Sequence, residues 1–184
     1  MNVGLVVEDY HAEALVEICR KISVNPEIRR QRGRINLKKA SRYVKQLIYD
    51  YDCEKVIILA DANCNPEGEK ERLNGVYPLL PEELRGRVHI SLAVHELESW
   101  LLADEAAVSK ILRRDVKAIA NPEEIHDAKG YLDELFKKAG KIYLTSLAKA
   151  IASSADLDKI TAKSASFEDF RDKVGDCFVG DKLI

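Results

Sequence analysis

Three apolar segments in the first half of the chain have the pattern of β-strands, and acidic residues follow each of them. The segments cover residues 2–8, 55–61 and 88–94. The first two are nearly continuous apolar runs, which are typical of strands buried on both faces of a sheet, and the third alternates between apolar and polar positions. The acidic residues that close or follow the segments are Glu8, Asp61, Glu96 and Glu98. We therefore expect three strands whose carboxyl ends carry carboxylates.

Between and after these strands, apolar residues recur every three or four positions, which predicts helices. The predicted helical faces lie at residues 14–22, 37–51, 97–103, 107–112, 131–136, 144–151 and from 166 onward. Strands that alternate with helices indicate an α/β protein with a mostly parallel sheet. We expect a single domain, residues 1–184, with a sheet of about four strands. Residues 1–104 would form the α/β core, and residues 105–184 a mainly helical C-terminal part.

A few polar and aromatic residues have positions that predict local roles. Asp9 and Ser166 precede helical segments, so both are expected to be N-cap residues. Asp104 is expected to cap the helix that begins at Glu105. Trp100 lies among leucines, and we interpret it as an anchor of the hydrophobic core.

Composition narrows the class of protein. The chain has 184 residues, of which 46% are hydrophobic and 33% charged, and its net charge is −2. Every apolar run is shorter than the roughly 20 residues that a membrane helix needs, and the N-terminus lacks the basic region of a secretory signal. The four cysteines have no CxxC spacing, which favours reduced thiols over a zinc knuckle. We therefore expect a soluble, cytoplasmic protein that does not associate with a membrane.

Basic residues concentrate in one segment, because residues 28–49 contain no Asp or Glu. One interpretation is a solvated edge strand followed by the surface of a helix, as in most charge runs. The other is a phosphate-binding patch, in which Arg30, Arg32 and Arg34 share a face if the segment is extended. The overall charge is slightly negative, so a surface for nucleic acid has to be local. The candidate phosphate contacts here are Arg30, Arg32, Arg34 and Lys38.

The acidic residues at the strand ends predict a metal site. Neighbouring parallel strands end at the same edge of a sheet, so their carboxylates should gather there. A divalent cation relieves the repulsion between them, and oxygen ligands favour Mg²⁺ or Mn²⁺, which can activate water for attack on a phosphodiester. The candidate metal ligands are Glu8, Asp61, Asn63, Glu96 and Glu98. A simpler interpretation treats Asp61 and Asn63 as the polar end of a core strand, with Asp61 capping the next segment.

Two histidines and Glu96 suggest a transition-metal site, but their positions argue against it. His89 is expected near the start of the third strand, and His95 lies beyond its end. Because a strand rises about 3.3 Å per residue, the two imidazoles should be far apart. We therefore expect His89 and His95 to have packing or surface roles.

Several short motifs resemble those of a known family. They are Glu8 after the first strand, Leu59-Ala60-Asp61-Ala62-Asn63, Glu98-Ser99-Trp100-Leu101-Leu102-Ala103-Asp104, Asn121-Pro122-Glu123, Asp127-Ala128-Lys129 and Ser166-Phe167-Glu168-Asp169-Phe170. In these motifs the chain resembles the DUF4276 family, a Toprim-related group of prokaryotic proteins of uncharacterised function. The resemblance spans most of the chain, and the Glu-x-Trp-Leu-Leu-Ala-Asp block is its most specific part.

This resemblance implies a Toprim-like three-layer fold and the chemistry of OLD-type nucleases. Glu8, Asp61 and Glu98 would then be the catalytic acids. The sequence departs from the Toprim pattern at two positions, since Asp9 follows the first acid where glycine is usual and Asn63 replaces a second aspartate. Asn63 can bind Mg²⁺ through its carbonyl but brings no charge, so metal affinity should be weaker.

Two functions follow from the motifs. The first is a nuclease, or a related phosphodiester-processing protein, that depends on Mg²⁺ or Mn²⁺. The alternative is a non-catalytic Toprim-like module that binds nucleic acid or a separate ATPase partner, because OLD-type Toprim domains work with ATPase domains and this chain has no Walker motif. Lys129 matches a family position and is a further candidate for phosphate contact. The choice between DNA and RNA and the oligomeric state stay open.

Overall fold

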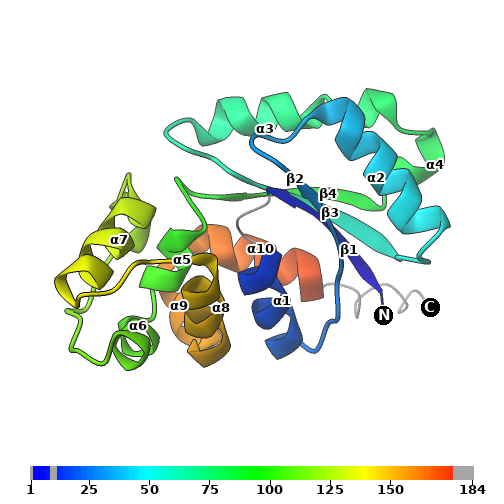
Figure 1. Ribbon diagram of the computed structural model, residues 1–184. Coiled ribbons are helices and arrows are strands. Elements are labelled where there is room, and N and C mark those ends of the chain that lie inside the picture. The colour runs from blue at the N-terminus through cyan, green and yellow to red at the C-terminus, as the bar shows by residue number, and fades with distance from the viewer. Residues whose placement is uncertain (1, 9–11, 176–184) are drawn as a thin grey trace.

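Four β-strands form one sheet in the computed structural model, which describes residues 2–8 and 12–175. The strands are β1 (Val3–Glu8), β2 (Glu27–Gln31), β3 (Lys55–Asp61) and β4 (Val88–Ala93). Their order in the sheet is β2-β1-β3-β4, and every neighbouring pair is parallel (Figure 1). The expected α/β protein with a mostly parallel sheet of about four strands is therefore confirmed.

Helices cover both faces of the sheet, so the fold has three layers (Figure 1). One face carries α2 (Leu37–Tyr49), α3 (Pro66–Asn74), the short 3-10 helix η2 (Tyr77–Leu79) and α4 (Glu82–Arg85). The other carries α1 (Ala12–Lys21), α5 (Glu98–Leu102) and α10 (Ala165–Gly175). Successive side chains of a strand point to opposite faces. Leu5 and Val7 therefore belong to one core, and Val6 belongs to the other.

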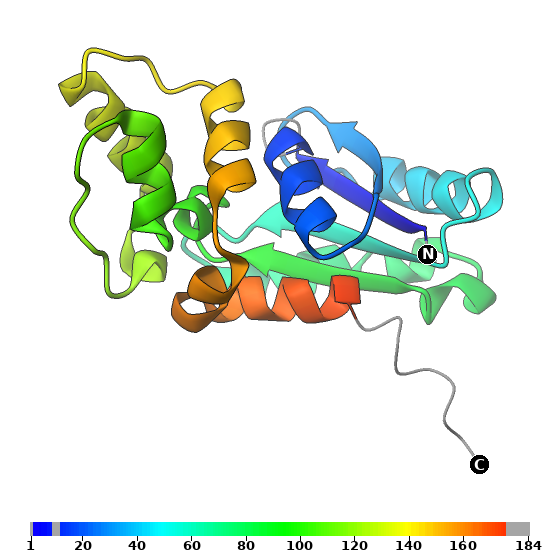
Figure 2. The same ribbon diagram turned by 90° about the horizontal axis from the view of Figure 1, so that it is seen from below.

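The chain after α5 is helical and returns to the sheet only at its end. It contains α6 (Glu105–Leu112), the 3-10 helix η3 (Pro122–Glu124), α7 (Ala128–Lys138), α8 (Thr145–Ser154) and α9 (Leu157–Lys163). Figure 2 shows α10 lying along the sheet beside β4. α8 packs against α1, and the buried residues of these helices share one core with the sheet. Within residues 2–8 and 12–175, none of the helices combines the length and apolar character that a membrane span requires.

Trp100 and Asp104 have the roles that their positions predict. Trp100 is fully buried, and its ring centroid lies 5.2 Å from those of both Phe167 and Phe170. It is therefore confirmed as an anchor of the core. Asp104 is confirmed as the N-cap of α6, since its Oδ1 accepts hydrogen bonds from two backbone N–H groups in the first turn of the helix.

The start of α10 differs from the prediction, because the helix begins at Ala165 and Ser166 lies inside its first turn. Ser164 has the capping role instead, since its hydroxyl accepts a hydrogen bond from the backbone N–H of Phe167 at 3.1 Å. The periodicity also does not predict α9, which is only seven residues long. Asp9, the other expected cap, lies outside the described residues.

The basic segment forms an edge strand followed by a bend. Arg30 lies in β2 at the edge of the sheet, and the strand ends at Gln31. Arg32 and Arg34 lie in the bend that follows, where Gly33 has a φ of +69°, a conformation that glycine adopts readily. The extended backbone on which a shared arginine face depends therefore does not reach these two residues.

Candidate functional site

The carboxyl ends of β1, β3 and β4 lie next to one another at one edge of the sheet. Val7 is paired with Leu59 in the parallel register, so Glu8 and Asp61 stand at the ends of neighbouring strands. The chain leaves β4 at the same edge and reaches Glu98, the first residue of α5. We refer to this region as the acidic edge, meaning the strand ends that carry Glu8 and Asp61 together with Glu98.

The carboxylate of Asp61 has a structural partner. Its Oδ1 accepts a hydrogen bond from the backbone N–H of Leu97 at 3.0 Å, which joins the end of β3 to the turn before α5. The Asn63 side chain donates to the backbone oxygen of Asp61 at 3.4 Å. Asn65, not Asp61, caps the helix α3 that follows β3. The simpler interpretation is therefore wrong about the capping role of Asp61. The Asp61 carboxylate binds the turn before α5, and Asn65 caps the next helix.

Glu98 is buried and lines a cavity of about 220 Å³. The other residues that line it are Ala14, Leu97, Lys129, Tyr143, Leu144, Thr145 and Ala148. The buried hydroxyl of Tyr143 has no hydrogen-bond partner among the residues that the structure describes. Burial, followed by the negative charge of Glu98, raises the pKa of Tyr143, so this hydroxyl stays protonated and can donate. The cavity thus combines a carboxylate, an ammonium group and an unpaired hydroxyl.

Glu96 holds the start of α7. Its Oε2 accepts a hydrogen bond from the backbone N–H of Lys129 at 2.8 Å, in the first turn of that helix. A carboxylate at a helix N-terminus is favourable, because the backbone N–H groups there carry partial positive charge. The structure therefore brings Lys129, a predicted phosphate contact, beside two predicted metal ligands, Glu96 and Glu98.

Arg34 lies close enough to Glu8 to be affected by its charge. The hydrogen bond and ion pair with Glu69 raise the pKa of the Arg34 guanidinium, and the negative charge of Glu8 adds to this effect. Arg34 and Asn63 also line one cavity of about 270 Å³. Arg34 is therefore the residue of the basic segment that lies beside the acidic edge. The remaining predicted phosphate contacts in this segment are exposed, and they are Arg30, Arg32 and Lys38.

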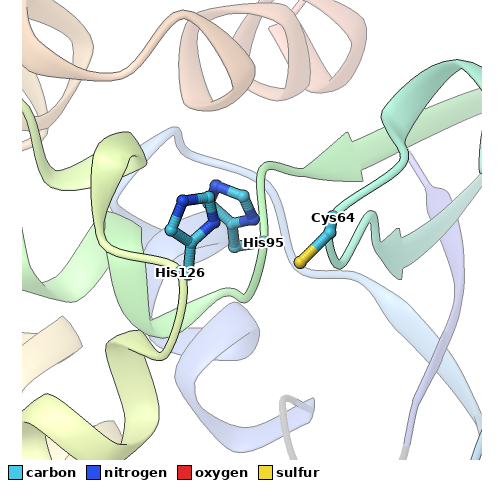
Figure 3. A group of neighbouring side chains, drawn as sticks. All are labelled: Cys64, His95 and His126. Atoms are coloured by element: carbon cyan, nitrogen blue, oxygen red, sulfur yellow. The ribbon is translucent and has the colours of Figure 1, made fainter.

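A second cluster of chemically active side chains lies at the same end of the sheet. The ligand atoms of Cys64, His95 and His126 are all within 4.8 Å of one another (Figure 3). We call this group the Cys–His cluster. His89 is the second residue of β4 and is not part of it, so the expected separation of His89 from His95 is confirmed. A packing or surface role was expected for His95. That expectation did not include Cys64 and His126, which come from distant segments and lie beside it.

The predicted catalytic acids are less tightly grouped than the Cys–His cluster. In residues 2–8 and 12–175, one group of at least three His, Cys, Asp or Glu side chains has ligand atoms this close, and Glu8, Asp61 and Glu98 do not belong to it. The three acids come from elements that converge on one edge. Rotation of their side chains would be needed for one cation to bind all of them.

A protein family matches almost the whole chain. The matching family is described as "Domain of unknown function (DUF4276)", and the match covers residues 8–175. The chain belongs to the DUF4276 family. No curated protein and no solved structure matches it. Membership in DUF4276 therefore brings no assigned activity, and the chemistry has to be argued from the site.

Several of the motifs that resemble DUF4276 meet in one hydrogen-bonded network beneath the sheet. Trp100 donates from Nε1 to the hydroxyl of Ser166 at 2.8 Å, and Ser166 donates to the carboxylate of Glu123. Glu123 also accepts from the hydroxyl of Ser164 at 2.7 Å. These contacts join α5, η3 and α10. The motif residues in this network therefore stabilise the packing of α5, η3 and α10 against one another.

Proposed function

We propose that this DUF4276 protein is a Mg²⁺- or Mn²⁺-dependent nuclease, or a related phosphodiester-processing enzyme, of the Toprim-related kind. Glu8, Asp61 and Glu98 would be its catalytic acids. The observation that carries the proposal is the parallel register, which puts Glu8 and Asp61 at the ends of neighbouring strands, with Glu98 on the segment that continues from β4. In open α/β sheets, ligands bind beyond the carboxyl ends of the strands.

The residues around the acidic edge suit this chemistry. Carboxylate and amide oxygens are the ligands that Mg²⁺ prefers, so Asn63 and Glu96 could complete the coordination. A divalent ion held there would lower the pKa of a coordinated water and stabilise the negative charge that develops on the phosphoryl oxygens. Arg34 and Lys129 would hold phosphate beside the metal. The exposed Arg30, Arg32 and Lys38 would contact the nucleic-acid backbone farther out.

The order of the acids along the chain also supports a Toprim relationship, since one acid ends the first strand and the next ends a later one. Asn63 in place of a second aspartate predicts weak metal binding, because one negative charge is lost.

A specific observation favours the non-catalytic alternative. Asp61 and Glu96 each accept a hydrogen bond from a backbone N–H group, so both have structural roles without a metal. In this second candidate function, the acidic edge maintains the fold, and the basic segment binds nucleic acid or the surface of a separate ATPase.

Metal titration combined with a cleavage assay on single- and double-stranded DNA and RNA separates the two functions. Asp61→Asn keeps an acceptor for the Leu97 N–H but removes the charge. We expect it to reduce Mg²⁺-dependent cleavage by at least about 100-fold, beyond the effect typical of a group that only supports a metal ligand. Glu134→Gln is the matched control, because Glu134 is exposed and pairs only weakly with Lys138 at 3.7 Å.

Two outcomes decide the matter. The enzyme proposal fails if Mg²⁺ and Mn²⁺ neither bind nor support cleavage and Asp61→Asn changes nothing. The binding alternative predicts nucleic-acid affinity that falls steeply with salt, with a slope that Arg32→Gln reduces by about 1. The absence of any affinity would exclude nucleic acid as the partner, and a salt-independent affinity would exclude contacts between the basic segment and phosphates.

A further inference from the structure

The Cys–His cluster is assembled from three segments that are distant in sequence. Cys64 follows the end of β3, His95 follows the end of β4, and His126 lies between η3 and α7. Figure 3 shows the rings of His95 and His126 next to each other, with the sulfur of Cys64 on the side of its residue that faces them. His95 is buried, whereas Cys64 and His126 are exposed, so two of the three side chains are accessible from solvent.

Backbone contacts fix His95 in an orientation that suits metal binding. Its Nδ1 lies 2.7 Å from the backbone oxygen of Asn63, and the backbone N–H of Asn63 donates to the oxygen of His95 at 3.0 Å. Because a carbonyl oxygen can only accept, Nδ1 carries the proton of this hydrogen bond. In the neutral ring, Nε2 is then left with a lone pair. Metal-binding histidines are commonly held in this way, with the other ring nitrogen donating to a backbone carbonyl.

The other two members are positioned by helix caps. Cys64 directly precedes Asn65, whose side chain accepts from the backbone N–H of Gly68 at 3.0 Å and caps α3. His126 directly precedes Asp127, which caps α7 in the same manner at 2.8 Å. The backbone on which each ligand sits is therefore held by a helix start, while the side chain keeps its freedom to rotate.

The ligand atoms are close to the spacing of a zinc site. Zn²⁺ binds sulfur at about 2.3 Å and imidazole nitrogen at about 2.0–2.1 Å in a tetrahedron, which places neighbouring ligand atoms roughly 3.3–3.7 Å apart. The observed ligand atoms lie within 4.8 Å of one another. Rotation of the two exposed side chains that moves their ligand atoms by about an ångström would bring all three atoms to this spacing. The rings of His95 and His126 are already in contact, with centroids 4.4 Å apart.

We propose that Cys64, His95 and His126 bind a transition-metal ion, with Zn²⁺ strongly preferred over Mg²⁺. Thiolate and imidazole are ligands for zinc, whereas Mg²⁺ requires oxygen. Three protein ligands leave a fourth position for water. The ion joins the ends of β3 and β4 to the loop before α7, and so ties the sheet to the C-terminal helices. The proposal does not depend on the nuclease function, because it uses none of the residues assigned to the acidic edge.

Titration of the metal-stripped full chain with Zn²⁺ and Co²⁺ tests the site. We expect one equivalent to bind and Co²⁺ to give the visible bands of a tetrahedral complex, with a near-ultraviolet charge-transfer band from the thiolate. Cys64→Ser should abolish that charge-transfer band. Cys64→Ser and His126→Gln should each weaken Zn²⁺ binding by at least about 100-fold, since each removes a direct ligand rather than a supporting group. Both residues are exposed, so both variants should keep the far-ultraviolet circular dichroism of the wild type.

His89→Gln is the matched control. His89 lies outside the cluster, so this substitution should leave the Co²⁺ spectrum unchanged. The proposal is overturned if the wild type binds no Zn²⁺, if excess Mg²⁺ displaces the bound ion, or if Cys64→Ser and His126→Gln bind as tightly as the control. Asp61→Asn should keep the Co²⁺ spectrum, so failure of the nuclease proposal and failure of the zinc site are distinguishable.

Discussion

Glu69 is a buried carboxylate between two guanidinium groups. It is 5% exposed and forms ion pairs with Arg34 and Arg72. The hydrogen bond from Arg72 is the main cause that lowers the pKa of Glu69 from 4.5 to about 2, against the opposing effect of burial. Arg34 is thereby held in place beside the acidic edge. At the scale of single residues, this network is the clearest source of pH-dependent stability in the described part of the chain.

We predict that Glu69→Gln lowers the free energy of unfolding at pH 7 by about 1–3 kcal/mol, because charge-assisted hydrogen bonds are lost. A carboxylate whose pKa is depressed in the folded protein contributes stability above its unfolded pKa, and this contribution is lost as the pH falls through the folded pKa. The difference between variant and wild type should therefore shrink between pH 4.5 and about 2. Urea denaturation over that range measures it.

Glu67→Gln is the control for this experiment, because Glu67 lies in the first turn of the same helix but is exposed. Its effect should stay within about 0.5 kcal/mol at every pH. Equal losses in the two variants, or a loss in Glu69→Gln that is undiminished near pH 2, would contradict a stabilising role for the buried carboxylate.

The candidate residues differ in how far the sequence predicts them. Glu8 and Asp61 end apolar runs, so their arrival at one sheet edge follows from strand periodicity and parallel pairing. Cys64 and His95 also follow strand ends, and this shared position is the signal that could have linked them. His126 has no such signal, because its place depends on the path of the loop before α7. Such tertiary placement does not follow from local patterns.

At the scale of elements, Ser166 is the contact through which α10 is joined to α5 and η3. Its hydroxyl accepts a hydrogen bond from the indole N–H of Trp100 and donates one to the carboxylate of Glu123. We predict that Ser166→Ala lowers the free energy of unfolding by about 2–3 kcal/mol, since the buried indole N–H and the carboxylate both lose a partner. Denaturation followed by the fluorescence of Trp100 measures this loss.

Ser153→Ala is the matched comparison, because Ser153 is exposed in α8 and its substitution should change stability by no more than about 0.5 kcal/mol. If Ser166→Ala were no more destabilising than Ser153→Ala, the network would not contribute to stability. The interpretation of these DUF4276 motif residues as structural would then be wrong.

Strong periodicity explains which elements the sequence predicts. The two strands with continuous apolar runs, the strand with alternating apolar residues and the longer helices are found close to their expected ranges. β2 has a single apolar residue, Ile28, among charged and polar ones. β2 is an edge strand that is not buried on both faces, so its sequence lacks a strong apolar pattern. Its pairing with β1 in the structure is what establishes it as a strand. The cap of α10 is Ser164, whose hydroxyl donates to Glu123 and also accepts from the backbone N–H of Phe167, while Ser166 already lies within the helix.

At the scale of the whole molecule, one core connects the sheet to the C-terminal helices. Buried residues of β1 and β3 on one face belong to the same cluster as those of α8, α9 and α10. The other face is closed by α2, α3 and α4 with a separate cluster. Residues 1–104 alone would expose to water the part of the first surface that α8, α9 and α10 cover, at a cost of roughly 25 cal/mol for each Å² of apolar area.

We therefore predict that the full chain unfolds in a single cooperative transition, whereas residues 1–104 do not fold alone. Trp100, the one tryptophan in the chain, packs on Phe167 and Phe170 and so reports on the junction between the two parts. In urea, its fluorescence and the far-ultraviolet circular dichroism should give the same midpoint, because a shared core couples the two signals. Separate midpoints in the full chain, or a cooperative transition in the isolated segment 1–104, would mean that the sheet forms an independent domain, with the helical part docked onto it.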